Sequence, residues 1–209
     1  MELEEAIRGR RSVRAYTDEP VPMELVRKAL EAGTWAPSAK NGQQWRFTVL
    51  TGESKRELIE AMREGLDATA KRIGRGAMGS SFSSCAIMEE APVVVMVWNA
   101  GSHATSAAGK ASRGILNWLL RARAEDLALW AEMEGVSAAV QNILLEAYAL
   151  GLGSLWICDV FHAYSPLRKH LGKGWQLVAA VTLGWPAEKE RKKAPPKKMS
   201  VDEVSEFLS

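Results

Sequence analysis

The chain has 209 residues, of which 47% are hydrophobic and 25% are charged, a composition that predicts one globular domain over residues 1–209 with a buried core. Its 27 basic and 25 acidic side chains leave a net charge of +2, which argues against nucleic acid or an anionic membrane as a partner. The longest apolar stretches, such as residues 91–98, are too short to span a bilayer.

In the first half of the chain, apolar spacing and turn residues predict three helices and two strands. The helices are predicted over residues 2–9, 22–33 and 53–72. The first strand is predicted over WRFTVLT, which begins at Trp45, and the second over the β-branched run from Ala91 to Trp98. Between the third helix and the second strand, the Gly/Ser-rich residues 74–84 predict a loop.

The second half predicts long helices and two further strands, which together indicate an α+β fold. A polar loop over residues 99–112 precedes a helix over about 115–133, and Ser137 caps another helix that runs to Leu150. This second helix is apolar on nearly every side, which indicates burial in a core or a subunit interface. The remaining predicted elements are strands at 153–157 and 175–185, a short helix from Ser165, an extended basic tail over 188–198 and a capping box from Ser200 to Glu203.

The opening residues and the cysteines indicate where the protein works. The sequence MELEEAIRGRR carries acidic residues and an amphipathic pattern, with no basic start followed by an apolar stretch, so it does not resemble a secretory signal. Cys85 and Cys158 lack the spacing of zinc or redox motifs, and the histidines lack metal-ligand spacing. We therefore expect a cytoplasmic protein without a metal site.

A literal G-x-G-x-x-G pattern occurs at Gly74, Gly76 and Gly79. In a dinucleotide-binding fold this pattern follows a strand and opens a helix, so that helix-terminal N–H groups face the pyrophosphate. Here it follows a charged helix and runs into serines. The context therefore favours a mobile loop over a dinucleotide site.

The segment from Arg10 to Arg14, with the sequence RRSVR, is a candidate anion site. In an extended chain, alternate side chains share one face, so Arg10, Ser12 and Arg14 would converge. Guanidinium groups match phosphate oxygens in bidentate geometry, which makes this spacing suitable for a phosphate clamp. A solvated basic turn would have the same spacing.

Two further segments could contact a ligand. Residues 36–45, with the sequence APSAKNGQQW, are dense in short polar side chains and amides, which can donate and accept hydrogen bonds at the edge of a heterocyclic ring. The same residues could simply form a turn. In residues 151–159, with the sequence GLGSLWICD, a buried helix ends at glycine and a strand begins. Glycines there allow close backbone approach to a ligand, or only cap the helix.

Taken together and in this order, the three segments and the basic tail resemble the nitroreductase family of FMN enzymes. Members open with R-x-S-x-[RK], follow with P-S-x-x-N-x-Q-x-W, carry a G-L-G-[ST]-x-W type of segment and end in a basic tail. The resemblance spans residues 2 to about 204. It implies a three-layer α+β sandwich with a central, mostly antiparallel sheet, an intertwined homodimer, and two FMN sites at the dimer interface.

The resemblance also implies roles for individual residues. The cofactor phosphate and ribityl chain would be held by residues of the arginine segment and the tail, namely Arg10, Arg11, Ser12, Arg14, Lys197 and Lys198. The other subunit would contribute Pro37, Ser38 and Asn41, and Gln43 of the same loop would also contact the cofactor. The backbone of Trp156, Ile157, Cys158 and Asp159 would face N5 and O4 of the flavin, with the Cys158 N–H nearest N5. Lys198 stands where arginine is usual, Gln44 where proline is usual, and the pair Cys158 and Asp159 where small residues are common.

The activity implied is electron transfer from NADH or NADPH to a small oxidised acceptor, such as a nitroaromatic or a quinone, by ping-pong hydride transfer through flavin N5. The flavin carries the chemistry, so no catalytic side chain is expected. Nothing in residues 99–135, which include His103, Asn117, Trp118 and Trp130, indicates a particular acceptor. Two alternatives remain: a flavin-consuming or dehalogenating enzyme of the same fold, and a non-catalytic protein that binds anionic partners through its basic segments.

Overall fold

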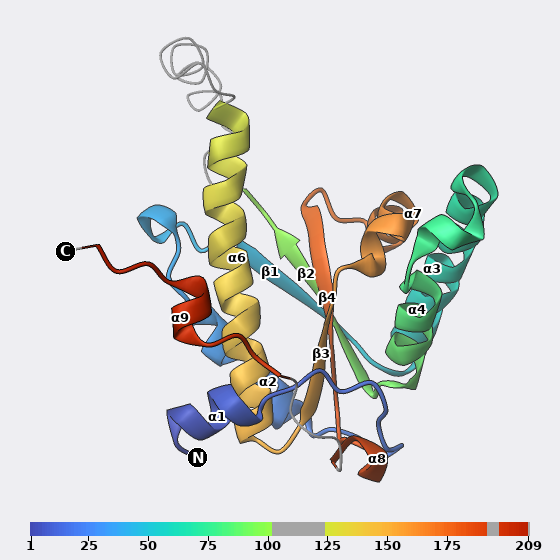
Figure 1. Cartoon of the computed structure of the whole chain (residues 1–209). Coiled ribbons are helices and arrows are strands. Elements are labelled where there is room, and N and C mark those ends of the chain that lie inside the picture. The colour runs from blue at the N-terminus through green and yellow to red at the C-terminus, as the bar shows by residue number, and fades with distance from the viewer. Residues whose placement is uncertain (102–123, 192–196, 209) are drawn as a thin grey trace.

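A four-stranded sheet lies between two layers of helices (Figure 1). The computed structural model describes residues 1–101, 124–191 and 197–208. Within these residues the strand order is β1-β2-β4-β3, and each neighbouring pair is antiparallel. The strands are β1 (Trp45–Leu50), β2 (Val93–Asn99), β3 (Gly153–Ile157) and β4 (Gln176–Gly184). The predicted α+β fold with a central antiparallel sheet is confirmed, and β3 is an edge strand.

Helices cover both faces of this sheet, which gives the expected three layers (Figure 1). One face is covered by α2 (Met23–Thr34) and the long α6 (Ala124–Ala149), which pack on each other, while α1 (Leu3–Gly9) contacts α6. The other face is covered by α3 (Gly52–Ile73), α4 (Ser81–Glu90) and α7 (Tyr164–Leu171). Among the described helices, none combines the length and apolarity needed to cross a membrane.

The alternation of side chains along β2 explains why the sheet needs a helical layer on each face. Val93, Val95 and Val97 are buried in the core shared with α2 and α6. Their neighbours Val94 and Met96, together with Trp98, are buried in the core shared with α3, α4 and α7. Successive side chains of a strand point to opposite faces, so a strand that is apolar at every position requires cover on both.

Two predicted boundaries are wrong. The loop predicted over residues 74–84 ends too late, because α4 (Ser81–Glu90) begins within it. This helix forms because Ser81, Ser84, Cys85 and Met88 share a buried face at helical spacing. The predicted break before Ser137 is absent. Instead α6 is continuous through Gly135, where a side chain would meet the Cβ of Ser38 at 3.1 Å. Gly135 is therefore a packing position and not a helix end.

The C-terminal segment is less extended than predicted. Residues Glu188–Arg191 form a short helix, α8, with acidic residues in its first turn that suit the helix dipole. The predicted capping box is confirmed at α9 (Val201–Val204), where the Ser200 hydroxyl accepts from the Glu203 N–H. Residues 115–123 of the helix predicted over 115–133, and residues 102–112 of the polar loop, lie outside the described residues.

The chain after α1 runs beside the ends of β3 and β4. The Val13 N–H donates to the Ser154 carbonyl at 2.9 Å, and the Thr17 N–H donates to the Trp185 carbonyl at 2.9 Å. Val13 is buried, and a Cβ atom placed on Gly153 would lie 2.8–3.0 Å from its branched side chain. A residue without a side chain is therefore required at position 153 for this segment to reach the sheet.

We predict that Gly153→Ala lowers the free energy of unfolding by about 1–3 kcal/mol, because Val13 or its backbone must shift to admit the methyl group. Gly174→Ala is the matched control, since no atom lies within 4 Å of the added Cβ there. Urea denaturation of both variants measures the difference. Equal stability of the two variants would show that the contact between Val13 and Gly153 is not close-packed.

Candidate functional site

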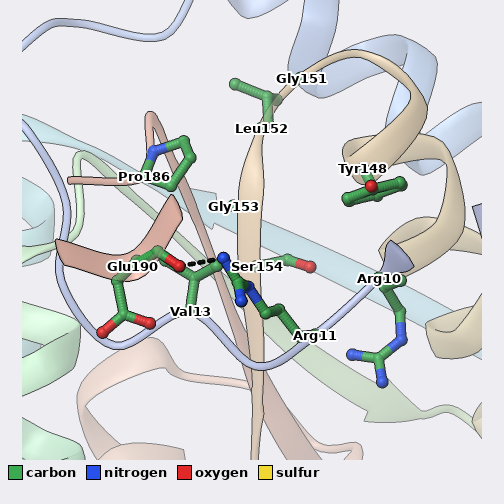
Figure 2. Close-up of a pocket in the computed structure, with 10 residues that line it drawn as sticks. All are labelled: Arg10, Arg11, Val13, Tyr148, Gly151, Leu152, Gly153, Ser154, Pro186 and Glu190. Atoms are coloured by element: carbon green, nitrogen blue, oxygen red, sulfur yellow. Dashed lines mark hydrogen bonds between the residues drawn. The ribbon is translucent and has the colours of Figure 1, made fainter. Parts of the chain in front are cut away.

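A pocket of about 220 Å³ lies where the arginine segment, the beginning of β3 and α8 meet (Figure 2). Its described lining consists of Arg10, Arg11, Val13, Tyr148, Gly151, Leu152, Gly153, Ser154, Pro186 and Glu190. Two of the segments singled out in the sequence, residues 10–14 and 151–159, therefore meet here. Tyr148, Pro186 and Glu190 were not predicted, because no motif marks them and only the packing of α6 and α8 brings them to the pocket.

The two arginines of the pocket differ in their partners. The Arg11 guanidinium points toward α8 and donates to the backbone carbonyl of Glu190 (Figure 2). Arg10 points the other way, and within the described residues it makes no hydrogen bond or ion pair. Ser12 and the exposed Arg14 adjoin the pocket without lining it, with an Arg14 nitrogen 3.5 Å from the Ser12 carbonyl. Arg10 is thus the guanidinium most available to an anion.

Tyr16 holds the arginine segment from the sheet side. Its hydroxyl donates to the Val13 carbonyl at 3.0 Å and lies 2.7 Å from the Thr182 hydroxyl, which is then the donor of that pair. Burial raises the pKa of Tyr16, so the phenol is neutral and keeps the proton that this bond requires. The contacts of Tyr16 with Val13 and Thr182 are therefore insensitive to physiological pH.

The free edge of β3 exposes backbone donors farther along the strand, beyond the residues that line this pocket. Because the Ser154 carbonyl accepts from Val13, the backbone polar groups of Ser154 point away from β4. Backbone groups of alternate residues in a strand point to the same edge, so the N–H groups of Trp156 and Cys158 also point outward. Within the described residues, no acceptor is found for either N–H. From Ser154 to Cys158 this edge extends about 13 Å, at about 3.3 Å per residue.

Cys158 and Asp159 lie where β3 ends. Cys158 is exposed as a residue, yet its thiol is partly desolvated, and this burial, followed by the charge of Asp159, raises the pKa of the Cys158 thiol. A raised pKa means that the thiol is protonated at neutral pH and is a weak nucleophile. The backbone N–H at this position is therefore better suited than the thiol to act on a ligand.

The Pro37 to Gln43 loop lies beside the middle of α6. It contains the short 3-10 turn Ala39–Asn41, and the Ser38 hydroxyl accepts from the Gln43 N–H at 3.0 Å. Gly135 of α6 packs against Ser38, whereas Tyr148 of α6 lines the pocket. Thirteen helical residues separate these contacts, which is about 20 Å at 1.5 Å per residue. Within one chain the structure does not bring this loop to the arginine segment.

The other predicted residues lie outside the pocket. Lys197 and Lys198 are exposed and are not part of its described lining. Trp130, on α6, is 62% exposed. His103, Asn117 and Trp118 lie outside the described residues.

Comparison with known proteins identifies the class to which this fold and site belong. The chain matches the Nitroreductase family over residues 7–185, so it belongs to that family. A relative from Methanothermobacter thermautotrophicus, named "Putative NADH dehydrogenase/NAD(P)H nitroreductase", is 31% identical over 192 residues, covering 90% of this chain and 79% of the relative. The resemblance drawn from the three motifs is thereby confirmed.

Solved structures show the same fold. A Desulfovibrio desulfuricans protein described as a "putative nitroreductase in complex with fmn" superposes with a TM-score of 0.69 at 27% identity, covering 100% of this chain and 98% of that one. A "BluB-like flavoprotein" from Clostridium difficile 630 superposes with a TM-score of 0.76 at 24% identity, covering 100% of both chains. At that identity the second likeness concerns the fold alone.

Proposed function

We propose that this protein binds FMN along the free edge of β3 and uses it to pass electrons from NADH or NADPH to a small oxidised acceptor. The observation that carries this proposal is the pairing of an available guanidinium, Arg10, with outward backbone N–H groups at Trp156 and Cys158. A ligand with an anionic group at one end would pair with the guanidinium. A flat ring with hydrogen-bond acceptors at its other end would pair with the backbone N–H groups. Membership of the Nitroreductase family supports this ligand class and argues against a non-catalytic interaction protein.

The residues present fit such a cofactor. Arg10, with Ser12 and Arg14 beside it, would hold the phosphate, and Lys197 or Lys198 would approach from the tail. Arg11 would contribute charge, although one of its nitrogens already donates to the Glu190 carbonyl. Gly153 keeps the arginine segment against the strand, so the phosphate site and the backbone donors share one rigid edge.

When bound, FMN would supply the hydride chemistry, accepting a hydride from the reduced nicotinamide and delivering two electrons to the acceptor. The chain would orient the ring through the backbone at Trp156, Ile157, Cys158 and Asp159. A donor fixed before reaction stabilises developing negative charge without reorganisation, which is the role of the Cys158 N–H. Its neutral thiol takes no part in this scheme.

We further propose that the complete site needs a second copy of the chain. The Pro37 to Gln43 loop, with Pro37, Ser38, Asn41 and Gln43, lies about 20 Å along α6 from the arginine pocket. In a homodimer it would reach the partner's pocket. Exposed apolar side chains on α1, at the end of α2 and on α6, namely Leu3, Ile7, Trp35 and Trp130, supply a surface suited to such an interface.

We predict that Arg10→Ala weakens FMN binding at least about ten-fold, because it removes charge-assisted hydrogen bonds of roughly 1.5–3 kcal/mol. Titration of apo-protein with FMN, followed by flavin fluorescence, gives the dissociation constant. Arg8→Ala is the matched control, since this exposed arginine of the neighbouring helix α1 pairs with Glu4 and does not line the pocket. Equal affinity in the two variants would remove Arg10 from the phosphate site.

Subunit complementation tests the shared site. We predict that Arg10→Ala and Asn41→Ala homodimers both bind FMN weakly, whereas the mixed dimer of the two variants recovers half of the wild-type sites. Recovery follows because one of its two sites then combines an intact Arg10 with an intact Asn41 of the partner. Differently tagged, co-expressed chains allow the mixed dimer to be purified, and sedimentation checks its mass. A mixed dimer without tight sites, or a monomer that binds FMN fully, would refute the proposal.

A further inference from the structure

A carboxylate beside the proposed flavin site is held by two hydroxyl groups from another layer of the fold. Asp159 is half-buried and directly follows Cys158. Its Oδ2 atom accepts from the Ser80 hydroxyl at 2.6 Å and from the Ser84 hydroxyl at 2.6 Å. Ser80 and Ser84 belong to the first turn of α4, and Ser84 is buried. These bonds connect the end of the edge strand β3 to α4, one of the helices on the sheet face opposite α2 and α6.

The serine at the start of α4 is not used in the ordinary way. Ser80 occupies the N-cap position, where a serine oxygen usually accepts from a backbone N–H of the first turn. Here it makes no such capping bond and donates to Asp159 instead. The Asp159 carboxylate therefore lies at the N-terminal, positive end of α4, where negative charge is favourable for the helix.

A second contact holds the far side of the same turn. The 3-10 segment Asp159–Ala163 contains His162, whose Nδ1 lies 2.7 Å from the Ser81 hydroxyl. Because that hydroxyl donates to the Met78 carbonyl at 2.7 Å, His162 is the donor to Ser81. The His162 carbonyl in turn accepts from Thr69 at 2.7 Å.

These contacts restrain the backbone of Cys158 from one side, while the sheet restrains it from the other. Ile157 is paired with Ala180 of β4, and the Cys158 carbonyl accepts from the Phe161 N–H at 3.2 Å. The Cys158 carbonyl thus has a hydrogen-bond partner. The Cys158 N–H has none among the described residues, and it points to the free edge. Its direction therefore depends on how firmly the turn at Asp159 is held.

We propose that Asp159 is a positioning residue of the flavin site, which acts with Ser80 and Ser84 to orient the Cys158 backbone N–H toward the ring. This inference rests on the proposed FMN function. The three residues are called the Asp159 clamp below. The clamp would make the donor rigid before the cofactor arrives, which is the condition under which a hydrogen bond contributes most to stabilising developing charge.

The first test uses apo-protein, so that it does not depend on flavin. Asp159→Ala and the Ser80→Ala/Ser84→Ala double variant should speed hydrogen exchange in peptides covering residues 157–161 by about ten-fold, because the turn loses its restraint. Ser83→Ala is the matched control. That hydroxyl lies in the same helical turn but donates to the Ser80 carbonyl and does not touch Asp159. Unchanged exchange in the clamp variants, with the control also unchanged, would overturn the proposal.

The second test uses FMN-loaded protein. We expect the clamp variants to keep FMN affinity within about two-fold, because the phosphate end is intact, while the rate of flavin reduction at saturating NADH or NADPH falls about ten-fold. This loss is smaller than the 10²–10³ expected when a donor is deleted outright. If the N–H favours reduced over oxidised flavin, the midpoint potential should fall by about 30 mV, the equivalent of a ten-fold change for two electrons.

The conservative variant separates positioning from charge. Asp159→Asn retains an oxygen that can accept from both serines, so it should preserve most of the reduction rate and potential. If Asp159→Asn behaved like Asp159→Ala, or if hydrogen exchange became faster with no change in the flavin reduction rate or midpoint potential, the proposal would be wrong.

A single variant replaces the double variant if the latter fails to fold. Ser80→Ala alone removes one exposed hydrogen bond and should give a smaller change in the same direction. Wild-type protein that bound no FMN would refute the proposed function, while apo-protein exchange would still judge the clamp.

Discussion

The hydrogen bond from the Val13 N–H to the Ser154 carbonyl is the contact on which the proposed site depends. It attaches the arginine segment to the outer edge of β3, and it also establishes which backbone groups of that strand point outward. The contact is possible only because Gly153 has no side chain where Val13 packs. The side chains proposed to bind an anion and the backbone donors of β3 are thereby brought onto one edge, although more than 130 residues separate them in the chain.

The long helix α6 keeps the Pro37 to Gln43 loop, the other segment proposed to contact the cofactor, away from this edge. Ser38 packs at Gly135, near the middle of α6, and Tyr148 lines the arginine pocket near the C-terminal end of the helix. Because this helix separates the arginine segment from the Pro37 to Gln43 loop within one chain, a site that uses both segments is better assembled from two subunits. In the proposed two-subunit site the loop's role depends on dimerisation, so changes at the subunit interface would act on cofactor binding as well as on stability.

The sequence was most informative where local pattern and tertiary environment agree. The run from Ala91 to Trp98 could be recognised as a buried strand because every position is apolar. The arginine segment could be predicted as a phosphate site because of its spacing, and in the structure it lies beside a pocket. The helix α4 could not, since serines and preceding glycines imitate a loop and only burial at helical spacing shows otherwise. The hydrogen bond between Asp159 and Ser80 could not be predicted either, because the two residues are 79 positions apart in the sequence and only the tertiary fold brings them together.

The central claim, that the free edge of β3 receives FMN, is tested most directly by following backbone amide resonances of isotope-labelled apo-protein during FMN titration. The amides of Trp156 and Cys158 should shift strongly and become protected from exchange, because they gain an acceptor. Amides of β1, the strand at the opposite edge of the sheet, provide the internal control. Shifts at Arg10 without any change at Trp156 and Cys158 would contradict the account, since the flavin would then lie elsewhere.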